Sequence, residues 1–424
     1  MTAEVAILNK QSVALAADSA VTTSDLKIFN TSKLFALSKS RPVGIMAYSS
    51  AEVMGVPVET VIKEFRRMRG PQSRQHLEEY AADFGEFLRE DKSVFCEEGR
   101  MHSLSILACG LIQKLFGDTR SKLQNGWGHP TSGEARNALS DAIAEMERRV
   151  NEASEVQVAQ PLKVRHLVCD AIENRLSETL TQLKGVLPVS ARAEKRIRKV
   201  VVDCFFRDMA VDGETGFAIA GFGDSDIFPR LRSFEFHYSA FGLHKMRDYA
   251  KVDISVSDAG RIVPFGQKDV MATFVEGMEP SCKAMLLSFI SRYFEEQKNM
   301  LMKEMPPRTS EAAAIEASGN ELVKRLPEAL SELAHNAFVW PMMHVVESMP
   351  KEELATLAEA FINLTTLKRK ASTDLETVGG PTDVAVISKG DGFVWIKRKH
   401  YFDLKYNPTF AIPRSMENSD ENPT

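Results

Sequence analysis

The opening of the chain alternates short apolar runs with short polar links. Val5 to Leu8 and Val13 to Ala17 are apolar throughout, and only Asn9-Lys10-Gln11 separates them. Two such runs joined by so few polar residues predict a tight hairpin of strands buried on both faces. Pro42 to Ala47 predicts another strand. The first 50 residues are therefore expected to fold as strands.

The spacing of apolar residues changes to a helical period after Pro57. We predict a helix that begins at Pro57 and ends before Gly70, since proline suits a first turn and glycine suits the position after the last. Its apolar stripe consists of Val58, Val61, Ile62, Phe65 and Met68. From about residue 71 to 210 the period is almost wholly helical. We interpret this long helical block as an insertion.

The second half of the chain returns to strands twice. Strand character is found between about residues 215 and 280, and a second helical block follows from about 281 to 347. A further helix is expected from about Lys351 to Ala371. Asp383 to Ser388 and Phe393 to Lys397 then predict a hairpin, because a turn with two glycines separates them.

This order of elements favours an α+β layered fold over a doubly wound α/β fold. We expect one discontinuous core, two helical insertions and a polar tail that is disordered. The expected core segments are 1–70, 211–280 and 348–412, the insertions are 71–210 and 281–347, and the tail is 413–424.

Composition and charge exclude several kinds of partner. With 53 Lys and Arg against 58 Asp and Glu, the formal net charge is -5, and we expect no nucleic-acid partner because such proteins carry basic surfaces. No apolar run reaches the roughly 18 residues that cross a bilayer, so no membrane partner is expected. The 5 cysteines are scattered and the 9 histidines lack metal-ligand spacing. We expect a cytoplasmic protein without a metal or other cofactor.

The candidate chemistry lies near the start of the chain. Thr2 precedes the first strand, Asp18 follows the second, and Lys33 comes fifteen residues later. With the strands around them, these residues resemble the opening of proteasome β-subunits and of the related bacterial HslV peptidase, which are N-terminal-nucleophile (Ntn) hydrolases. The resemblance covers about residues 2 to 69, 215 to 280 and 346 to 402. It implies a four-layer αββα sandwich with a threonine nucleophile.

The three residue types suit that chemistry. A threonine hydroxyl is a poor nucleophile, but the α-amine of an N-terminal threonine can accept its proton. A Lys33 ammonium nearby would lower the pKa of that amine, and Asp18 would hold the ammonium in place. Thr2 becomes N-terminal only if Met1 is removed, which the small threonine side chain permits for methionine aminopeptidase. If Met1 is retained, the mechanism fails.

The resemblance also implies supporting residues late in the chain. Family members carry an Asp-x-x-Ser element after a long helix, and that element supports the threonine amine. Here Asp374 and Thr377 occupy the corresponding positions before Gly379-Gly380, with threonine in place of serine and Val378 as an extra residue.

The resemblance assigns Thr22, Tyr48 and Ser49 to the oxyanion and substrate-binding region. Family members usually have glycines where Tyr48 and Ser49 stand. A backbone N–H can still stabilise an oxyanion there, whatever its side chain. A family serine is also absent from Val275-Glu276-Gly277-Met278, where its counterpart is expected.

Two functions remain open from the sequence. The first is a threonine amidohydrolase acting on a peptide or another amide through an acyl-ester on Thr2. The second is a catalytically silent Ntn-fold scaffold or binding protein, which Tyr48 and the absent serine favour, whereas the joint presence of Thr2, Asp18 and Lys33 favours the enzyme. In both cases the apolar stripes of the inserted helices predict a homo-oligomer, a small closed assembly rather than a stacked ring.

Overall fold

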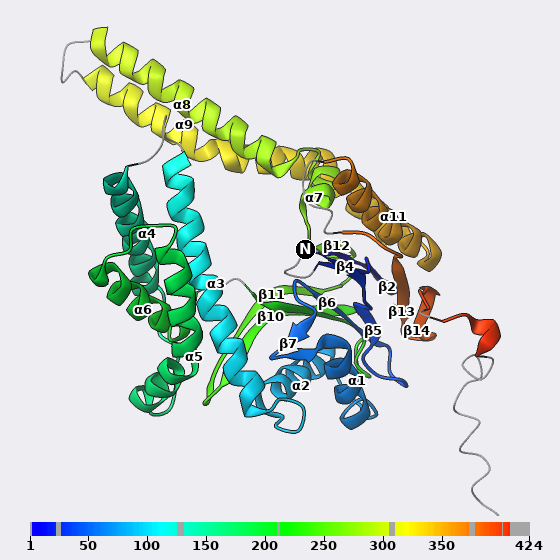
Figure 1. Cartoon of the computed structure of the whole chain (residues 1–424). Helices are drawn as coiled ribbons and strands as arrows, with labels where there is room; N and C mark the ends of the chain where they lie inside the picture. Colours follow the sequence, from blue (N-terminus) through cyan, green and yellow to red (C-terminus); the bar gives the residue numbers. More distant parts are fainter. Residues whose placement is uncertain are drawn as a thin grey trace, which may run out of the picture.

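The computed structural model describes residues 2–22, 27–124, 131–209, 213–304, 310–372, 378–400 and 402–407. Two five-stranded sheets form its centre (Figure 1). The first contains β1 (Ala3–Asn9), β2 (Ser12–Ala17), β12 (Gly260–Gly266), β13 (Asp383–Ser388) and β14 (Gly392–Lys397), and the second contains β5 (Leu34–Ala36), β6 (Val43–Tyr48), β9 (Thr215–Gly221), β10 (Arg230–Ala240) and β11 (Leu243–Asp253). The strand orders are β12-β1-β2-β13-β14 and β11-β10-β9-β6-β5, and neighbouring strands run antiparallel. The protein is thus of mixed α+β class.

Both predicted hairpins are confirmed. β1 pairs with β2, and β13 pairs with β14. Asn9 closes the first turn, because its Oδ1 accepts hydrogen bonds from the backbone N–H groups of Gln11 at 3.0 Å and Ser12 at 3.2 Å. β2 also pairs with β13, so the first and last hairpins of the sequence share one sheet.

Alternate side chains of β1 enter two different cores. Ala6 and Leu8 lie between the two sheets, in a cluster with buried side chains of β6 and β9. Ala3, Val5 and Ile7 lie on the opposite face, against α11 (Lys351–Lys370). β1 is buried on both faces. A polar side chain on its inner face is therefore enclosed between the two sheets.

The outer face of the second sheet is covered by α1 (Val58–Met68) and α2 (Leu77–Glu90). Phe65 of α1 meets Phe84 of α2 edge to face at 5.0 Å, and Phe84 meets Phe217 of β9 at 4.9 Å. α2 falls within the block that the sequence suggested as an insertion. In the structure it packs on the sheet beside α1, because its aromatic stripe matches the apolar face of β9 and β10.

The rest of that block forms a helical bundle beside the β10–β11 hairpin (Figure 1). The bundle consists of α3 (Glu97–Gln124), α4 (Ser132–Glu152), α5 (Pro161–Lys184) and α6 (Ala191–Phe205). Leucine, isoleucine and valine side chains from all four helices form one cluster, which also takes in Tyr238 of β10. The Tyr238 hydroxyl donates a hydrogen bond to the carbonyl of Phe205 at 2.7 Å. The end of α6 is thereby attached to the second sheet.

The second helical block begins with α7 (Asp269–Glu276) and continues as a pair of long helices that extend away from the sheets (Figure 1). These are α8 (Pro280–Glu304) and α9 (Ser310–Ala334), and a π-helical turn at His335–Val339 joins α9 to α10 (Trp340–Ser348). α10 packs on the first sheet, where Asn9 Nδ2 donates to the carbonyls of Val346 at 3.2 Å and Met349 at 2.8 Å. None of the helices in the described ranges is long and apolar enough to cross a membrane.

Candidate active site

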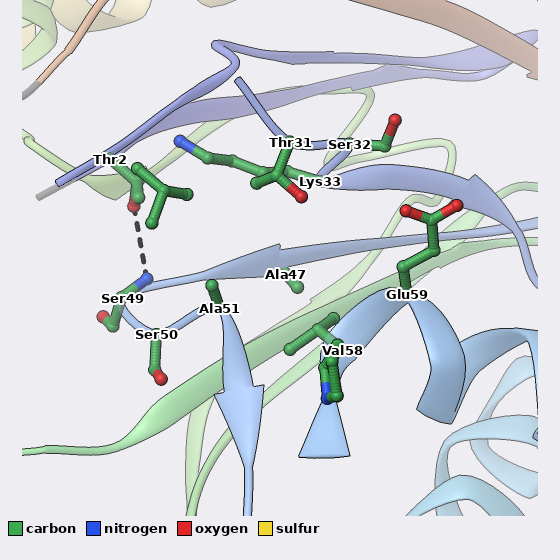
Figure 2. Close-up of a pocket in the computed structure, with 12 residues that line it drawn as sticks. Thr2, Thr31, Ser32, Lys33, Ala47, Ser49, Ser50, Ala51, Val58 and Glu59 are labelled. Atoms are coloured by element: carbon green, nitrogen blue, oxygen red, sulfur yellow. Dashed lines mark hydrogen bonds between the residues drawn. The ribbon is translucent and has the colours of Figure 1, made fainter. Parts of the chain in front are cut away.

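Thr2 lies at the entrance between the two sheets, just before β1. Its side chain is buried, and its Oγ1 accepts a hydrogen bond from the backbone N–H of Ser49 at 3.2 Å (Figure 2). Its carbonyl accepts one from the N–H of Gln267 at 2.8 Å. A Cβ at Gly266, whose φ is +66°, would lie 2.1 Å from the Thr2 carbonyl oxygen. Glycine there lets the end of β12 hold Thr2 by its backbone.

Asp18 lies beside Thr2, immediately after β2, and is fully hydrogen-bonded. Its carboxylate accepts from the backbone N–H groups of Ala3 at 3.1 Å, Ala20 at 3.2 Å and Gly379 at 3.0 Å. Lys33 Nζ is the fourth donor, at 2.5 Å. The aspartate that ends β2 is thus fixed from three segments of the chain at once.

Lys33 extends from the segment before β5 toward Thr2 (Figure 2). It is only 4% exposed, so its ammonium depends on buried partners for stabilisation. Asp18 supplies one at 2.5 Å, and Oε1 of Glu4 lies 3.6 Å away. Of the sequence-predicted residues, Thr2, Asp18 and Lys33 therefore come together at one point.

A cavity of about 100 Å³ opens beside Thr2. Its walls combine small hydroxyl-bearing side chains, small apolar side chains, the Lys33 side chain and one carboxylate, that of Glu59 in the first turn of α1. Glu59 is itself paired with Lys63 at 2.5 Å. The lining residues are Thr2, Val21, Thr31, Ser32, Lys33, Ala47, Ser49, Ser50, Ala51, Pro57, Val58 and Glu59. A modest side chain of a bound molecule would fit there.

Ser49 and Tyr48 are neighbours in the chain, but their side chains lie in different places. Ser49 lines the cavity and has a φ of +71°, an uncommon conformation for a residue with a side chain, which turns its N–H toward Thr2. Tyr48, which the sequence suggested for the substrate side, instead buries its ring between the sheets, with its hydroxyl 2.9 Å from that of Ser233. Gly216 makes room for the ring, because a Cβ there would lie 2.0 Å from it.

The other predicted site residues are placed only in part. Thr22 ends the short strand β3 (Ala20–Thr22), and its neighbour Val21 lines the cavity. Asp374 and Thr377 lie outside the described residues. Gly379, close behind them in the chain, donates to Asp18, so the segment after α11 returns to the site.

Two ionisable residues that the sequence analysis did not single out also lie here. Lys399 contacts the hydroxyl of Ser19 and the carbonyl of Thr31, both at 2.5 Å, and pairs with Asp383 at 3.1 Å. Burial lowers the pKa of Lys399.

Glu4 is completely buried. The sequence contained a sign that Glu4 belongs to the site. It is the one carboxyl in a strand that is otherwise apolar up to Asn9, and the period of two places it on the same face as Thr2.

The described chain is a mixed α+β protein built on antiparallel sheets, and its site gathers a threonine, a lysine and two carboxyls. No protein-family model and no curated protein matches its sequence. Among solved structures it is similar to a mutant Anbu from Hyphomicrobium sp. strain MC1 (11% identity, TM-score 0.30, 100% of both chains covered). It is also similar to Anbu, titled an ancestral β-subunit, from Yersinia bercovieri (8%, 0.28, 100% of this chain and 98% of that one), and to a helical assembly of the Anbu complex from Pseudomonas aeruginosa (9%, 0.29, 100% and 98%). Similarities this low establish no shared activity.

Proposed function

We propose that this protein is a proteasome-like threonine amidohydrolase of the Ntn class, with a four-layer αββα core, and that it cleaves a peptide bond through Thr2. The observation that supports this most strongly is the convergence of Thr2 Oγ1, the Lys33–Asp18 pair and the Ser49 N–H beside a cavity. The proposal requires that Thr2 be the first residue of the mature chain, since only then does it carry a free α-amine.

The proposed reaction uses the α-amine of Thr2 as the base. It accepts the Oγ1 proton while Oγ1 attacks the amide carbonyl carbon, and it then passes that proton to the leaving nitrogen as the C–N bond breaks. The acyl group remains on Oγ1 as an ester. Water, deprotonated by the same amine, then attacks the ester and releases the acid, which restores the hydroxyl.

The surrounding groups would stabilise the charges that develop. The Lys33 ammonium disfavours a second positive charge close by and so keeps the amine neutral. The Ser49 N–H lies beside Oγ1 and is a candidate donor to the oxyanion of the tetrahedral intermediate. The cavity between Thr2 and Glu59 would take a side chain of the substrate, and its volume favours a modest one.

Intact-mass spectrometry tests the requirement for a free Thr2. We expect the native protein to lack Met1 and to gain a single adduct when treated with a β-lactone, an electrophile that acylates activated hydroxyls. Peptide mapping should place the adduct on Thr2. Retained Met1, together with no adduct, would favour a scaffold or binding protein instead.

The exposed side of α8 supports the expected homo-oligomer. Met285, Phe289 and Tyr293 recur every four residues and are at least half exposed, and Met300 continues the series. Apolar stripes of this kind are usually covered by another surface. Light scattering coupled to size exclusion should give a small closed oligomer, and the double substitution Phe289→Glu, Tyr293→Glu should reduce its mass. A mass of one chain for the unsubstituted protein would show that the stripe joins no copies.

A further inference from the structure

Glu4 is a buried carboxyl next to Thr2. The Thr2 hydroxyl and the Lys33 ammonium favour its ionised form, but neither makes a hydrogen bond of ordinary length with it. On the neighbouring strands it lies opposite Ala17 and Phe265, which are both buried. The exposed fraction of Glu4 is 0%, and among the described residues neither of its carboxyl oxygens has a hydrogen-bond partner. An ionised carboxylate in such a place would lose its hydration without replacement.

The nearby positive charge lies closer to Asp18 than to Glu4. Lys33 is the nearest cation, but it is 3.6 Å from Glu4 and 2.5 Å from Asp18, which also holds three backbone N–H groups. Lys399 is paired with Asp383, and the other charges that act on it are Lys33 and Asp18 rather than Glu4. One ammonium thus lies near two carboxyls, and the four short hydrogen bonds at this point all go to Asp18.

We propose that Glu4 is a positioning residue of the Thr2 site that keeps its proton while the site is active, so that a single carboxylate, Asp18, balances Lys33. This role presupposes the hydrolase function proposed above. Burial raises the pKa of Glu4 to about 8. Asp18 raises it further, and the attraction of Lys33 and the hydroxyl of Thr2 oppose this rise. The carboxyl is therefore neutral at neutral pH.

The protonation state of Glu4 matters because negative charge develops close to it. The reaction removes a proton from Thr2 Oγ1 and places an oxyanion near the Ser49 N–H. A neutral Glu4 leaves Lys33 free to favour both events. An ionised Glu4 adds a second negative charge beside Lys33 and opposes them. Glu4 is thus expected to switch the site off as the solution becomes alkaline.

The test is the pH dependence of acylation of Thr2 by a β-lactone, followed by intact mass. In this reaction Oγ1 forms an ester with the lactone carbonyl, the ring C–O bond breaks, and the Oγ1 proton ends on the released hydroxyl. For the unsubstituted protein we expect the rate to fall above about pH 8, and at about pH 9 to be roughly one tenth of its maximum. Glu4→Gln, close in shape to the neutral acid, should move this alkaline limb upward by about one pH unit or more.

Glu235→Gln is the matched control. Glu235 is a partly buried carboxyl of β10 whose pKa burial also raises, but it belongs to the other sheet. This variant should keep the alkaline limb of the unsubstituted protein. If Glu4→Gln fails to fold, Glu4→Met removes the same proton and suits the apolar surroundings.

The outcomes separate this role from the proposed function. An adduct at Thr2 whose alkaline limb is the same with and without Glu4 would overturn the role of Glu4 alone. No adduct at Thr2 in the unsubstituted protein would overturn the hydrolase function and this role with it.

A second readout does not depend on activity. The folded chain holds the Glu4 proton at pH values where the unfolded chain releases it. Glu4 therefore contributes stability that is fully present below the ordinary pKa of glutamate and is lost as the pH rises through about 8. The urea midpoint of the unsubstituted protein should fall across this range more steeply than that of Glu4→Gln. Parallel curves would show that Glu4 is ionised in the folded chain.

Discussion

Thr2→Ala should abolish hydrolysis of any amide substrate. The substitution removes Oγ1, which is the only atom able to form the proposed acyl-ester, so the rate should fall by more than about 10⁴-fold, as it does when a nucleophile is removed from a serine protease. The fold should persist, because the Thr2 side chain is small and its hydroxyl only accepts a hydrogen bond at 3.2 Å from the N–H of Ser49. Activity is measured on a library of fluorogenic peptides.

Thr2→Ser is the matched control for this experiment. It retains the hydroxyl and the α-amine, and Met1 should still be removed because serine is also small. We expect part of the activity to survive. If Thr2→Ala cleaved the same peptides as fast as the unsubstituted protein, another residue would be the nucleophile.

Asp18→Ala should cause the largest loss of stability among single substitutions at the site. It leaves the Lys33 ammonium buried without its closest partner, and it leaves three backbone N–H groups without an acceptor. Breaking a buried ion pair from one side costs about 3–5 kcal/mol. The free energy of unfolding, measured by guanidinium chloride denaturation followed by circular dichroism, should fall by an amount of that order.

Arg148→Ala provides the comparison for Asp18→Ala. Arg148 also forms close ion pairs, with Glu145 at 2.6 Å and Glu152 at 2.6 Å, but on the exposed side of α4. Exposed pairs contribute little because water and salt screen them. The unfolding midpoint of Arg148→Ala should therefore stay close to that of the unsubstituted protein. An equally small effect of Asp18→Ala would mean that Lys33 is not held in the site by that carboxylate.

The elements nearest the site were predictable because local pattern determines them. The run of apolar residues on either side of Asn9 specified the first hairpin, and the spacing of the Gly-containing turn specified the last one. Thr2 precedes β1 and Asp18 follows β2, and since these two strands are paired, the two residues necessarily lie at the same end of the hairpin. This part of the site follows from sequence order and strand geometry alone.

Other features depend on contacts between distant segments and could not be predicted in this way. The inward ring of Tyr48 requires a glycine at position 216 in a different strand. The placement of α2 on the second sheet depends on aromatic contacts with Phe217. The proposed protonation state of Glu4 depends on the distances from Lys33 to Asp18 and to Glu4. These distances can be read only from the folded structure.

The junction between α9 and α10 has a mechanical consequence. The helix runs from the far end of the α8–α9 pair through the π-helical turn at His335–Val339 and continues onto the first sheet. There the carbonyl of Met343 meets Gly260 so closely that a Cβ would lie 2.7 Å away, and the last turn holds Asn9 at the end of β1. The projecting pair is thus connected, through α10, to β1, the strand that follows Thr2. A displacement of the pair would therefore be expected to reach β1 through Asn9, at the end of the strand opposite Thr2.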